Sequence, residues 1–525
     1  MSRPSAFARH GLLLLLALAA AALYAPNLGD YFLGDDFDLI RSFHGKPFSY
    51  LIGLLWSNES GDVWKDWGLD PAKGLGYLRP FKIWLLALDS ALWGTNPLGY
   101  HVTATLCFVA MVVVAARLLE RLLPQHRVLA VAGAGVAMMH PICAEIVPFL
   151  TAREETLAIA FGLAAVLAFL RARDTGAASP AFACLLALAL GVKESSVAVV
   201  ALAASHDLAH GRMRPWSPEF RRDARIWWPA LAVLVVYFGL RRLAFGNFAG
   251  GDGSAMNFGA THVLGFHARL FASLGDPTLW AVGGVGGGAS LFALLALAPV
   301  VAVGWQWKRI PSARRRDLLF VGPLWYLSTT ALYAAVPFAS RHHIFPVLGL
   351  VFFETVALAT LLDLGVLRRE RRVALGLLAV GALAFLPPSI ITSREFRHAS
   401  RVVEDLRAQI EARTAGIPDG SDLVLRGVPQ LVLPPFFFGW GLRSALAPPF
   451  TTSDVSGRMT VLNPLHRELN RITKPVESVH GVEVDVGRSD AIPRWMKLRY
   501  RQREVREGEG TAPEPKAPGD PAQPH

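Results

Sequence analysis

Long apolar runs separated by short polar connections are the feature of this sequence that most restricts its fold. After an apolar stretch at 11–25, such runs occupy about 100–123, 128–149, 155–170, 226–245, 279–304, 318–338, 344–366 and 373–391. A helix needs about 20 apolar residues to cross a bilayer, so most of these runs are long enough to cross it singly. Only 18% of the residues are charged, whereas soluble domains carry about 25%. A water-soluble enzyme and a disordered scaffold are therefore excluded, and we expect an all-α, multi-pass integral membrane protein.

The distribution of Lys and Arg predicts how the chain crosses the membrane. Short connections on the cytoplasmic side of membrane proteins are enriched in these residues. The strongly basic connections contain Arg3 and Arg9, Arg117, Arg121 and Arg127, Arg171 and Arg173, and residues 212–225, 308–316 and 368–372. If all of them face the cytoplasm, residues 181–209 must cross an even number of times, which predicts a broken hairpin with Lys193 and Glu194 at its tip. About 11 segments result, with the C-terminus outside the cytoplasm. The net charge of +11 then reflects loops beside anionic lipid, so no nucleic-acid partner is expected.

The chain divides into three predicted regions. Residues 1–391 form the membrane domain, and its first extracytoplasmic loop covers 26–79. The stretch at 11–25 is either a retained first helix or a cleaved signal peptide, and both place residue 26 outside the cytoplasm. Residues 392–504 are expected to form a small extracytoplasmic α/β region, with an amphipathic helix at 395–413 and short strands and turns at 421–450. The Pro- and Gly-rich tail at 505–525 is expected to be disordered.

Unusual ionisable residues gather on the side of the membrane that this topology places outside. They are Asp35, Asp36, Arg79, Arg153, Glu154, Glu155, Lys193, Glu194, Arg241, Arg242, Arg341, His342 and His343. Ionisable residues near membrane depth are costly and indicate a functional site. A carboxylate can accept a proton from a reacting hydroxyl, and clustered cations can bind a phosphate. This combination favours transfer from a lipid-phosphate donor to an acceptor outside the cytoplasm.

Cofactor signatures are scarce. The glycine run at 283–288 lies inside an apolar stretch with no strand before it, so it is interpreted as a helix-packing or bending element and not as a phosphate-binding loop. The three cysteines lie in apolar runs without the Cys/His spacing of a zinc site. No metal site is predicted and no cofactor is required, although the acidic first loop is compatible with a divalent cation.

Six short motifs occur in an order that resembles one family. They are FLGDDFDLI at 32–40, YLRPF at 77–81, ALWGTNPLGYH at 91–101, MHPICAEIVPFLTAREETLA at 139–158, LALGVKESSV at 188–197 and SRHHIFPVLG at 340–349. In this order the chain resembles the polytopic glycosyltransferases of the GT-C fold. The specific resemblance is to the protein O-mannosyltransferase branch that includes the transmembrane-and-TPR mannosyltransferases. It covers roughly residues 10–365, whereas no TPR array follows and the C-terminal 130 residues match no named domain.

The resemblance implies a role for each matching residue. Asp35 corresponds to the general base for the acceptor hydroxyl, with Asp36 as its partner. Glu155 corresponds to the second acidic position, and Arg341 to a basic position near the donor phosphate. Arg79 and Lys193 match further positions for which phosphate or sugar contacts are inferred from charge, as they are for Arg241. The implied reaction is an inverting displacement on a polyprenyl-phosphate sugar, and His342 and His343 stand where the family has tyrosine.

Structural interpretations remain open for most of these residues. Asp35 and Asp36 could form a turn or helix cap, and Arg241 and Arg242 could extend to lipid headgroups. Lys193 and Glu194 could pair with each other. Two further sets of predicted site-lining residues have structural alternatives: His140 as a helix kink, and Glu145 and Arg153 as a buried ion pair. His342 and His343 could titrate or bind a metal, but two adjacent histidines without a third ligand are weak evidence for either.

The sequence therefore favours a membrane glycosyltransferase with membrane lipids and a polyprenyl-phosphate sugar as partners, in a bacterial inner membrane. The acceptor is a hydroxyl of protein, lipid or glycan. A transporter or flippase for lipid-linked sugars is one alternative, and a non-catalytic membrane scaffold is the other. A transporter would use the same cations without needing Asp35, and a scaffold would tolerate changes at both Asp35 and Arg341.

Overall fold

The computed structural model describes most of the membrane domain and parts of the C-terminal region. The described residues are 6–53, 77–212, 218–246, 248, 259–275, 291–333, 340–367, 371–414, 423–426, 438, 441–456, 459–462 and 482–485. Residues 54–76 of the predicted first loop, the glycine run at 283–288 and the predicted tail at 505–525 lie outside them.

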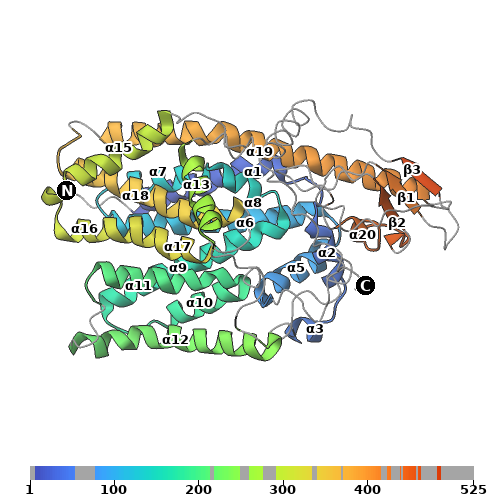
Figure 1. The fold of residues 1–525 in the computed structure, drawn as a ribbon, viewed down its shortest axis with the longest axis horizontal. Coiled ribbons are helices and arrows are strands. Elements are labelled where there is room, and N and C mark those ends of the chain that lie inside the picture. Colours follow the sequence, from blue (N-terminus) through green and yellow to red (C-terminus); the bar gives the residue numbers. More distant parts are fainter. Residues whose placement is uncertain are drawn as a thin grey trace, which may run out of the picture.

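Helices account for nearly all the described structure (Figure 1). They are α1 (Ala6–Tyr24), α2 (Asp35–Phe43), α3 (Phe48–Gly53), α5 (Pro80–Trp93), α6 (Pro97–Leu122), α7 (Arg127–Met138), α8 (Pro141–Ile146), α9 (Arg153–Thr175), α10 (Pro180–Val192), α11 (Ala198–Ala209), α12 (Pro218–Phe245), α13 (Ala260–Gly275), α15 (Leu291–Trp305), α16 (Ser312–Leu319), α17 (Trp325–Tyr333), α18 (Ile344–Asp363), α19 (Arg371–Thr414) and α20 (Leu442–Ala445). Short 3₁₀ turns that matter for the site are η3 (Leu150–Ala152), η4 (Glu194–Val197) and η8 (Ser340–His343).

Six of the described helical segments are long and apolar enough to cross a membrane. They are His10–Asn27, Pro97–Leu122, Leu150–Thr175, Ala224–Phe245, Arg341–Asp363 and Arg372–Ala412. The shorter helices α7 and α10 are also apolar. The prediction of an all-α integral membrane fold is confirmed, and the total of about 11 segments stays a prediction.

The broken hairpin predicted at 181–209 is present. α10 ends at Val192, Lys193 has an extended backbone (φ −155°, ψ 130°), and η4 leads into α11. The helix is interrupted here because two polar residues stand between two apolar helices of 13 and 12 residues. Lys193 is thereby fixed at the tip of the hairpin.

Basic connections far apart in the sequence meet at one end of the bundle. Arg121, Arg173, Arg212 and Arg314 come from four such connections, and all four line a single cavity. In Figure 1, α16 and the N-terminus lie at this end, whereas α2, α5, α20 and the strands lie at the other. The acidic motif of α2 is thus separated from the basic loops by the length of the bundle, as the topology predicts.

Local sequence explains where the helices near the site begin. Proline stands at the first position of α5, α6, α8 and α10, where its missing N–H costs no hydrogen bond. Asn96 caps α6 by accepting a hydrogen bond from the backbone N–H of Leu98. α2 follows Gly34, which has a positive φ of 49°, and carries three aspartates in its first turn. Negative charge is favourable there because it opposes the positive end of the helix dipole.

The C-terminal region contains a small parallel sheet. Its strands are β1 (Leu423–Arg426), β2 (Met459–Leu462) and β3 (Val482–Asp485), in the order β2-β1-β3. Parallel strands with a preceding helix agree with the predicted α/β character of this region. α19 runs without interruption through residue 391, the predicted domain boundary.

Candidate active site

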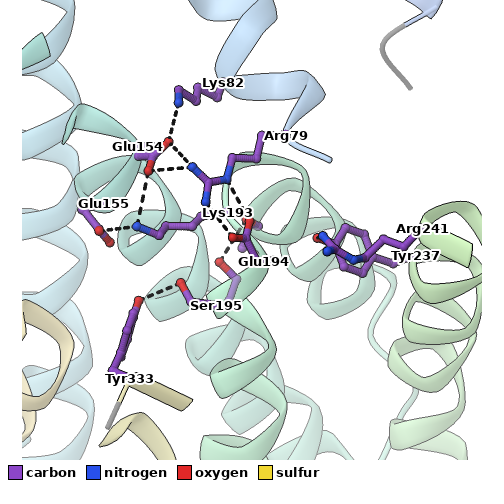
Figure 2. A network of polar contacts seen from close by, with 12 residues as sticks. Arg79, Lys82, Glu154, Glu155, Lys193, Glu194, Ser195, Tyr237, Arg241 and Tyr333 are labelled. Atoms are coloured by element: carbon purple, nitrogen blue, oxygen red, sulfur yellow. Dashed lines mark hydrogen bonds and ion pairs between the residues drawn. The ribbon is translucent and has the colours of Figure 1, made fainter. Parts of the chain in front are cut away.

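A buried network of ion pairs lies where α5, α9 and the hairpin tip meet (Figure 2). In this network each positive side chain contacts at least one negative side chain, and the residues come from three separate parts of the chain. They are Arg79, Lys82, Glu154, Glu155, Lys193 and Glu194. Three cations and three carboxylates make the network electrically balanced, which is the condition under which charges are stable away from water.

Glu154 is the centre of this network. Its carboxylate accepts a hydrogen bond from Arg79 Nη1 at 3.0 Å and lies 2.8 Å from Lys82 Nζ and 3.3 Å from Lys193 Nζ. Arg79 also donates from Nε and Nη2 to the two carboxylate oxygens of Glu194, at 2.8 and 2.6 Å. Glu154 therefore holds three cations from two separate segments in one place.

Lys193 points away from its neighbour Glu194 in the chain. Its ammonium group pairs with Glu155 and Glu154, whereas Glu194 pairs with Arg79. Burial alone would lower the pKa of Lys193, but the carboxylates of Glu155 and Glu154 hold that pKa above its usual value. The interpretation of Lys193 and Glu194 as a mutual pair is wrong, because the extended backbone at residue 193 directs adjacent side chains to opposite sides.

The two aspartates at the start of α2 have different environments. Asp36 is 3% exposed, and its carboxylate accepts hydrogen bonds from the backbone N–H and the hydroxyl of Thr151, at 2.8 and 2.6 Å, and from the backbone N–H of Leu33 at 3.0 Å. Burial raises the pKa of Asp36 to about 7, although these hydrogen bonds, which favour the charged form, oppose the rise. One oxygen of Asp36 joins α2 to η3 and the other binds the backbone just before α2, so both oxygens have a structural role.

Asp35 is half-buried and offers its carboxylate to no hydrogen bond or ion pair within the described part of the chain. Burial raises the pKa of Asp35, and the positive charges of Arg341 and Lys82 partly offset that rise. An ionised carboxylate with unused lone pairs is what a general base requires.

Arg341 in η8 is the cation that acts most strongly on Asp35. Four carboxylates lie near enough to act on its charge: Glu155, Glu145, Glu154 and Asp35. Its half-buried guanidinium makes no hydrogen bond or ion pair with another described residue. The chain thus brings a carboxylate from residue 35 and a cation from residue 341 to the same side of the bundle, and neither bonds to another described residue.

Aromatic and hydroxyl groups continue the site below the ion network. Tyr333 at the end of α17 donates a hydrogen bond to Ser195 Oγ at 2.7 Å (Figure 2), and the ring of His342 stacks on Tyr333 with 5.0 Å between centroids. His343 packs against Phe266, and His140 packs against Phe385 and caps α8.

Two predicted site residues have other contacts. Arg153 pairs with Asp89 of α5, so its interpretation as the partner of Glu145 is wrong. Thr103 donates to the same aspartate at 2.8 Å, which joins α5, α6 and α9. Arg241 is buried on α12, where it donates to the carbonyl of Phe248 at 3.2 Å and to the Tyr237 hydroxyl at 3.4 Å. These contacts are local to α12, beside the network of Figure 2.

Lys82, Asp89 and Tyr333 belong to the site or its support and were not singled out from the sequence. Lys82 lies three residues after Arg79 in an apolar helix, a spacing that places both on one helix face. That spacing was an available signal. Asp89 and Tyr333 carry no comparable signal, because their partners are 64 and 138 residues away.

A second polar region lies at the opposite end of the bundle. It is a cavity of about 510 Å³ lined by arginines and aspartates. The arginines there are largely paired: Arg121 with Asp174, Arg173 with Asp207, and Arg314 with Asp317 and Asp363. The acids and cations there compensate each other, so the end that carries α2 and η8 is the better candidate for chemistry. Within the described residues, no group of three or more His, Cys, Asp or Glu side chains is arranged to hold a metal.

When this chain is compared with known proteins, the similarity found is to solved structures. No family model matches this chain, and no curated protein matches it in sequence. ArnT from Cupriavidus metallidurans bound to undecaprenyl phosphate is 13% identical, with 89% of this chain and 88% of that one covered and a TM-score of 0.47. The apo state of that ArnT gives a TM-score of 0.42 at 12% identity, with 80% of this chain and 82% of that one covered.

An oligosaccharyltransferase from Archaeoglobus fulgidus, tethered with an acceptor peptide, is also similar. It is 12% identical, with 88% of this chain and 64% of that one covered, and the TM-score is 0.43. At these levels of similarity, function is inferred from the residues of this chain. The mannosyltransferase branch of the resemblance is not tested by them and stays a prediction.

Proposed function

We propose that this protein is a membrane glycosyltransferase that moves a sugar from a polyprenyl-phosphate donor to a hydroxyl acceptor. The reaction takes place at the extracytoplasmic face of a bacterial inner membrane. The observation that carries the proposal is the pair of half-buried groups Asp35 and Arg341, which act on each other's charge beside a balanced ion network and bond to no other residue that the structure describes. A carrier needs cations for the phosphate but no unpaired carboxylate next to them.

The chemistry assigns each group a step. Asp35 accepts the proton of the acceptor hydroxyl as the oxygen attacks the anomeric carbon of the donor sugar. The bond from that carbon to the phosphate oxygen breaks, and the configuration at the carbon inverts. Arg341 stabilises the negative charge that develops on the departing polyprenyl phosphate. Arg79, Lys82 and Lys193 add positive potential, although their carboxylate partners neutralise most of it.

The primary test is a transfer assay with purified protein and radiolabelled polyprenyl-phosphate sugars. Hydroxyl acceptors of the protein, lipid and glycan classes would be offered separately. We expect the wild type to release polyprenyl phosphate and to label one acceptor class. Movement of intact donor across proteoliposome membranes without any release of polyprenyl phosphate would instead identify a carrier. The absence of both transfer and transport would identify a scaffold.

Arg341→Gln is expected to lower kcat/KM for the donor by roughly 10- to 100-fold, the value of a hydrogen bond between a cation and a charged oxygen. Arg341→Lys keeps the charge but loses the bidentate hydrogen-bonding geometry, so its kcat/KM should lie between those of Arg341→Gln and the wild type. Steady-state kinetics with varied donor would measure both variants. Arg242→Gln is the matched control, because Arg242 is exposed and, among the described residues, bonds to the nearby Gly246 carbonyl. Equal losses at 341 and 242 would contradict the assignment.

The pH dependence of kcat/KM follows from Asp35. A general base must be deprotonated, so activity should fall as the pH drops through the pKa of Asp35. Burial raises that pKa above its usual value, and Arg341 lowers it again. The acid limb should therefore lie above pH 3.8 in the wild type, and at higher pH in Arg341→Gln than in Arg341→Lys. A pH–rate profile of the three proteins measures this order, and a reversed order would remove Asp35 as the titrating group.

A further inference from the structure

The segment at 441–456, together with Phe438, packs directly on the helix that carries Asp35. Phe37 of α2 is stacked with Phe438 at 6.3 Å and meets Phe450 edge-on at 4.9 Å between centroids. Ser444 donates a hydrogen bond to the Asp38 carboxylate, and Arg41 pairs with Asp454 at 3.4 Å. Three residues of a nine-residue helix are thus contacted by residues more than 390 positions later in the chain.

Gly441 makes the closest of these approaches. A Cβ atom at this position would lie 2.0 Å from the carbonyl oxygen of Gly34 and 3.3 Å from Cβ of Phe37. Gly34 is the residue bonded to Asp35, and its positive φ of 49° sets the direction in which α2 starts. Any side chain at 441 must therefore displace the peptide group that joins residue 34 to Asp35.

The segment is itself anchored to the long helix α19. Arg407 donates to the carbonyl of Phe450 at 2.7 Å, and the backbone N–H of Thr452 donates to Glu411 at 2.9 Å. Phe438, Ser444 and Leu446 are each at most 1% exposed, so the contact is packed as tightly as a protein core.

The opposite side of α2 is held by the membrane domain. Asp36 accepts two hydrogen bonds from Thr151 of η3, as described above. α2 is therefore fixed between η3 on one side and the 441–456 segment on the other. Asp35 is the one aspartate of the first turn that takes part in neither contact: Asp36 binds Thr151, and Asp38 binds Ser444.

We propose that the 441–456 segment is a positioning element, which fixes the Asp35 carboxylate relative to Arg341 through Gly441 and Ser444. The inference rests on the proposed function, since it assigns to the C-terminal region the task of orienting the general base. None of its residues needs to contact the donor. Disturbing the contact between this segment and α2 should then lower turnover while leaving donor binding intact.

Gly441→Ala is the test variant, and Gly376→Ala in α19 is the matched control, because a Cβ at 376 meets no atom within 4 Å. We expect Gly441→Ala to lower kcat by about 100-fold, the effect of displacing a catalytic group by about 1 Å. KM for the donor should stay unchanged. The acid limb of the pH–rate profile should also move, because Asp35 changes its distance from Arg341. Gly376→Ala should match the wild type in all three measurements.

A purely structural role for the segment predicts a different result. Activity would then fall in proportion to the loss of folded protein, with kcat per folded molecule and the pH profile unchanged, and this outcome would overturn the proposal. If Gly441→Ala does not fold, Ser444→Ala provides the same readouts. It removes one hydrogen bond to Asp38 and should lower kcat by about fivefold without changing donor KM. A wild-type kcat in Ser444→Ala would count against the proposal.

Hydrogen–deuterium exchange separates this proposal from the proposed function. We expect backbone amides at 34–43 to exchange faster in Gly441→Ala than in the wild type, with amides of α6 and α9 unchanged. If the wild type transfers no sugar but this change is seen, the proposed function fails and the positioning contact stands. If exchange at 34–43 is unchanged, the positioning proposal fails regardless of activity.

Discussion

Asp35→Asn is expected to reduce the turnover of sugar transfer by roughly 10²- to 10⁴-fold, the contribution of a positioned general base. The substitution keeps the size and shape of the side chain and removes its ability to accept a proton. KM for the polyprenyl-phosphate donor should change little, because Asp35 is assigned to the acceptor hydroxyl. Initial rates with labelled donor at saturating concentration measure the loss.

The variant should remain folded, which makes the kinetic result interpretable. Asp35 makes no hydrogen bond or ion pair within the described residues, so asparagine removes no such contact. Because burial raises the pKa of Asp35, its charged form is disfavoured in the folded state, and its neutral form contributes stability that is lost as the pH rises through that pKa. At neutral pH an uncharged replacement should therefore leave the thermal midpoint unchanged or slightly higher.

Substitutions at two other aspartates serve as comparisons. Asp405→Asn changes an exposed aspartate of α19 and should retain full activity. Asp36→Asn places an N–H₂ group against either the Thr151 or the Leu33 donors, so it should lower the thermal midpoint as well as activity. Undiminished transfer by Asp35→Asn would exclude Asp35 as the base, and the carrier interpretation would then be favoured.

The sequence predicted the all-α membrane fold and the broken hairpin because both depend on local quantities. The length of each apolar run and the parity of the basic connections were sufficient to predict the hairpin of α10 and α11 around Lys193. Both quantities are set by the solvent, lipid or water, that each segment must face. They need no knowledge of which helix packs against which.

Pairing inside the site depends on packing that the sequence does not encode locally. A pair between Arg153 and Glu145, eight positions away, was one open interpretation, but Arg153 pairs with Asp89 of α5. A pair between Lys193 and the adjacent Glu194 was one open interpretation, but Lys193 pairs with Glu155 of α9. In both cases the partner is fixed by the contact of separate helices. The same reason explains why nothing in the sequence pointed to Gly441, whose importance comes entirely from its approach to Gly34.

Glu154→Gln is expected to destabilise the protein by about 3–5 kcal/mol, the cost of leaving buried charges without their partner. Three cations contact this carboxylate, and the remaining acids, Glu155 and Glu194, cannot neutralise all of them. Thermal unfolding of the purified protein in detergent would show a large drop in midpoint. Glu120→Gln is the control, since its partner Arg117 is partly exposed to solvent, and exposed pairs contribute about 0–1 kcal/mol.

A double variant distinguishes charge balance from the loss of individual hydrogen bonds. Glu154→Gln combined with Lys82→Met removes one negative and one positive charge, so the network returns to neutrality with two cations and two carboxylates. If balance is what stabilises this site, the double variant should be more stable than Glu154→Gln alone, although it has lost more contacts. If each contact contributed separately, the double variant would be the less stable of the two. The first result would mean that Arg79, Lys82 and Lys193 are held near the site by their carboxylates, leaving Arg341 as the cation available to the donor phosphate.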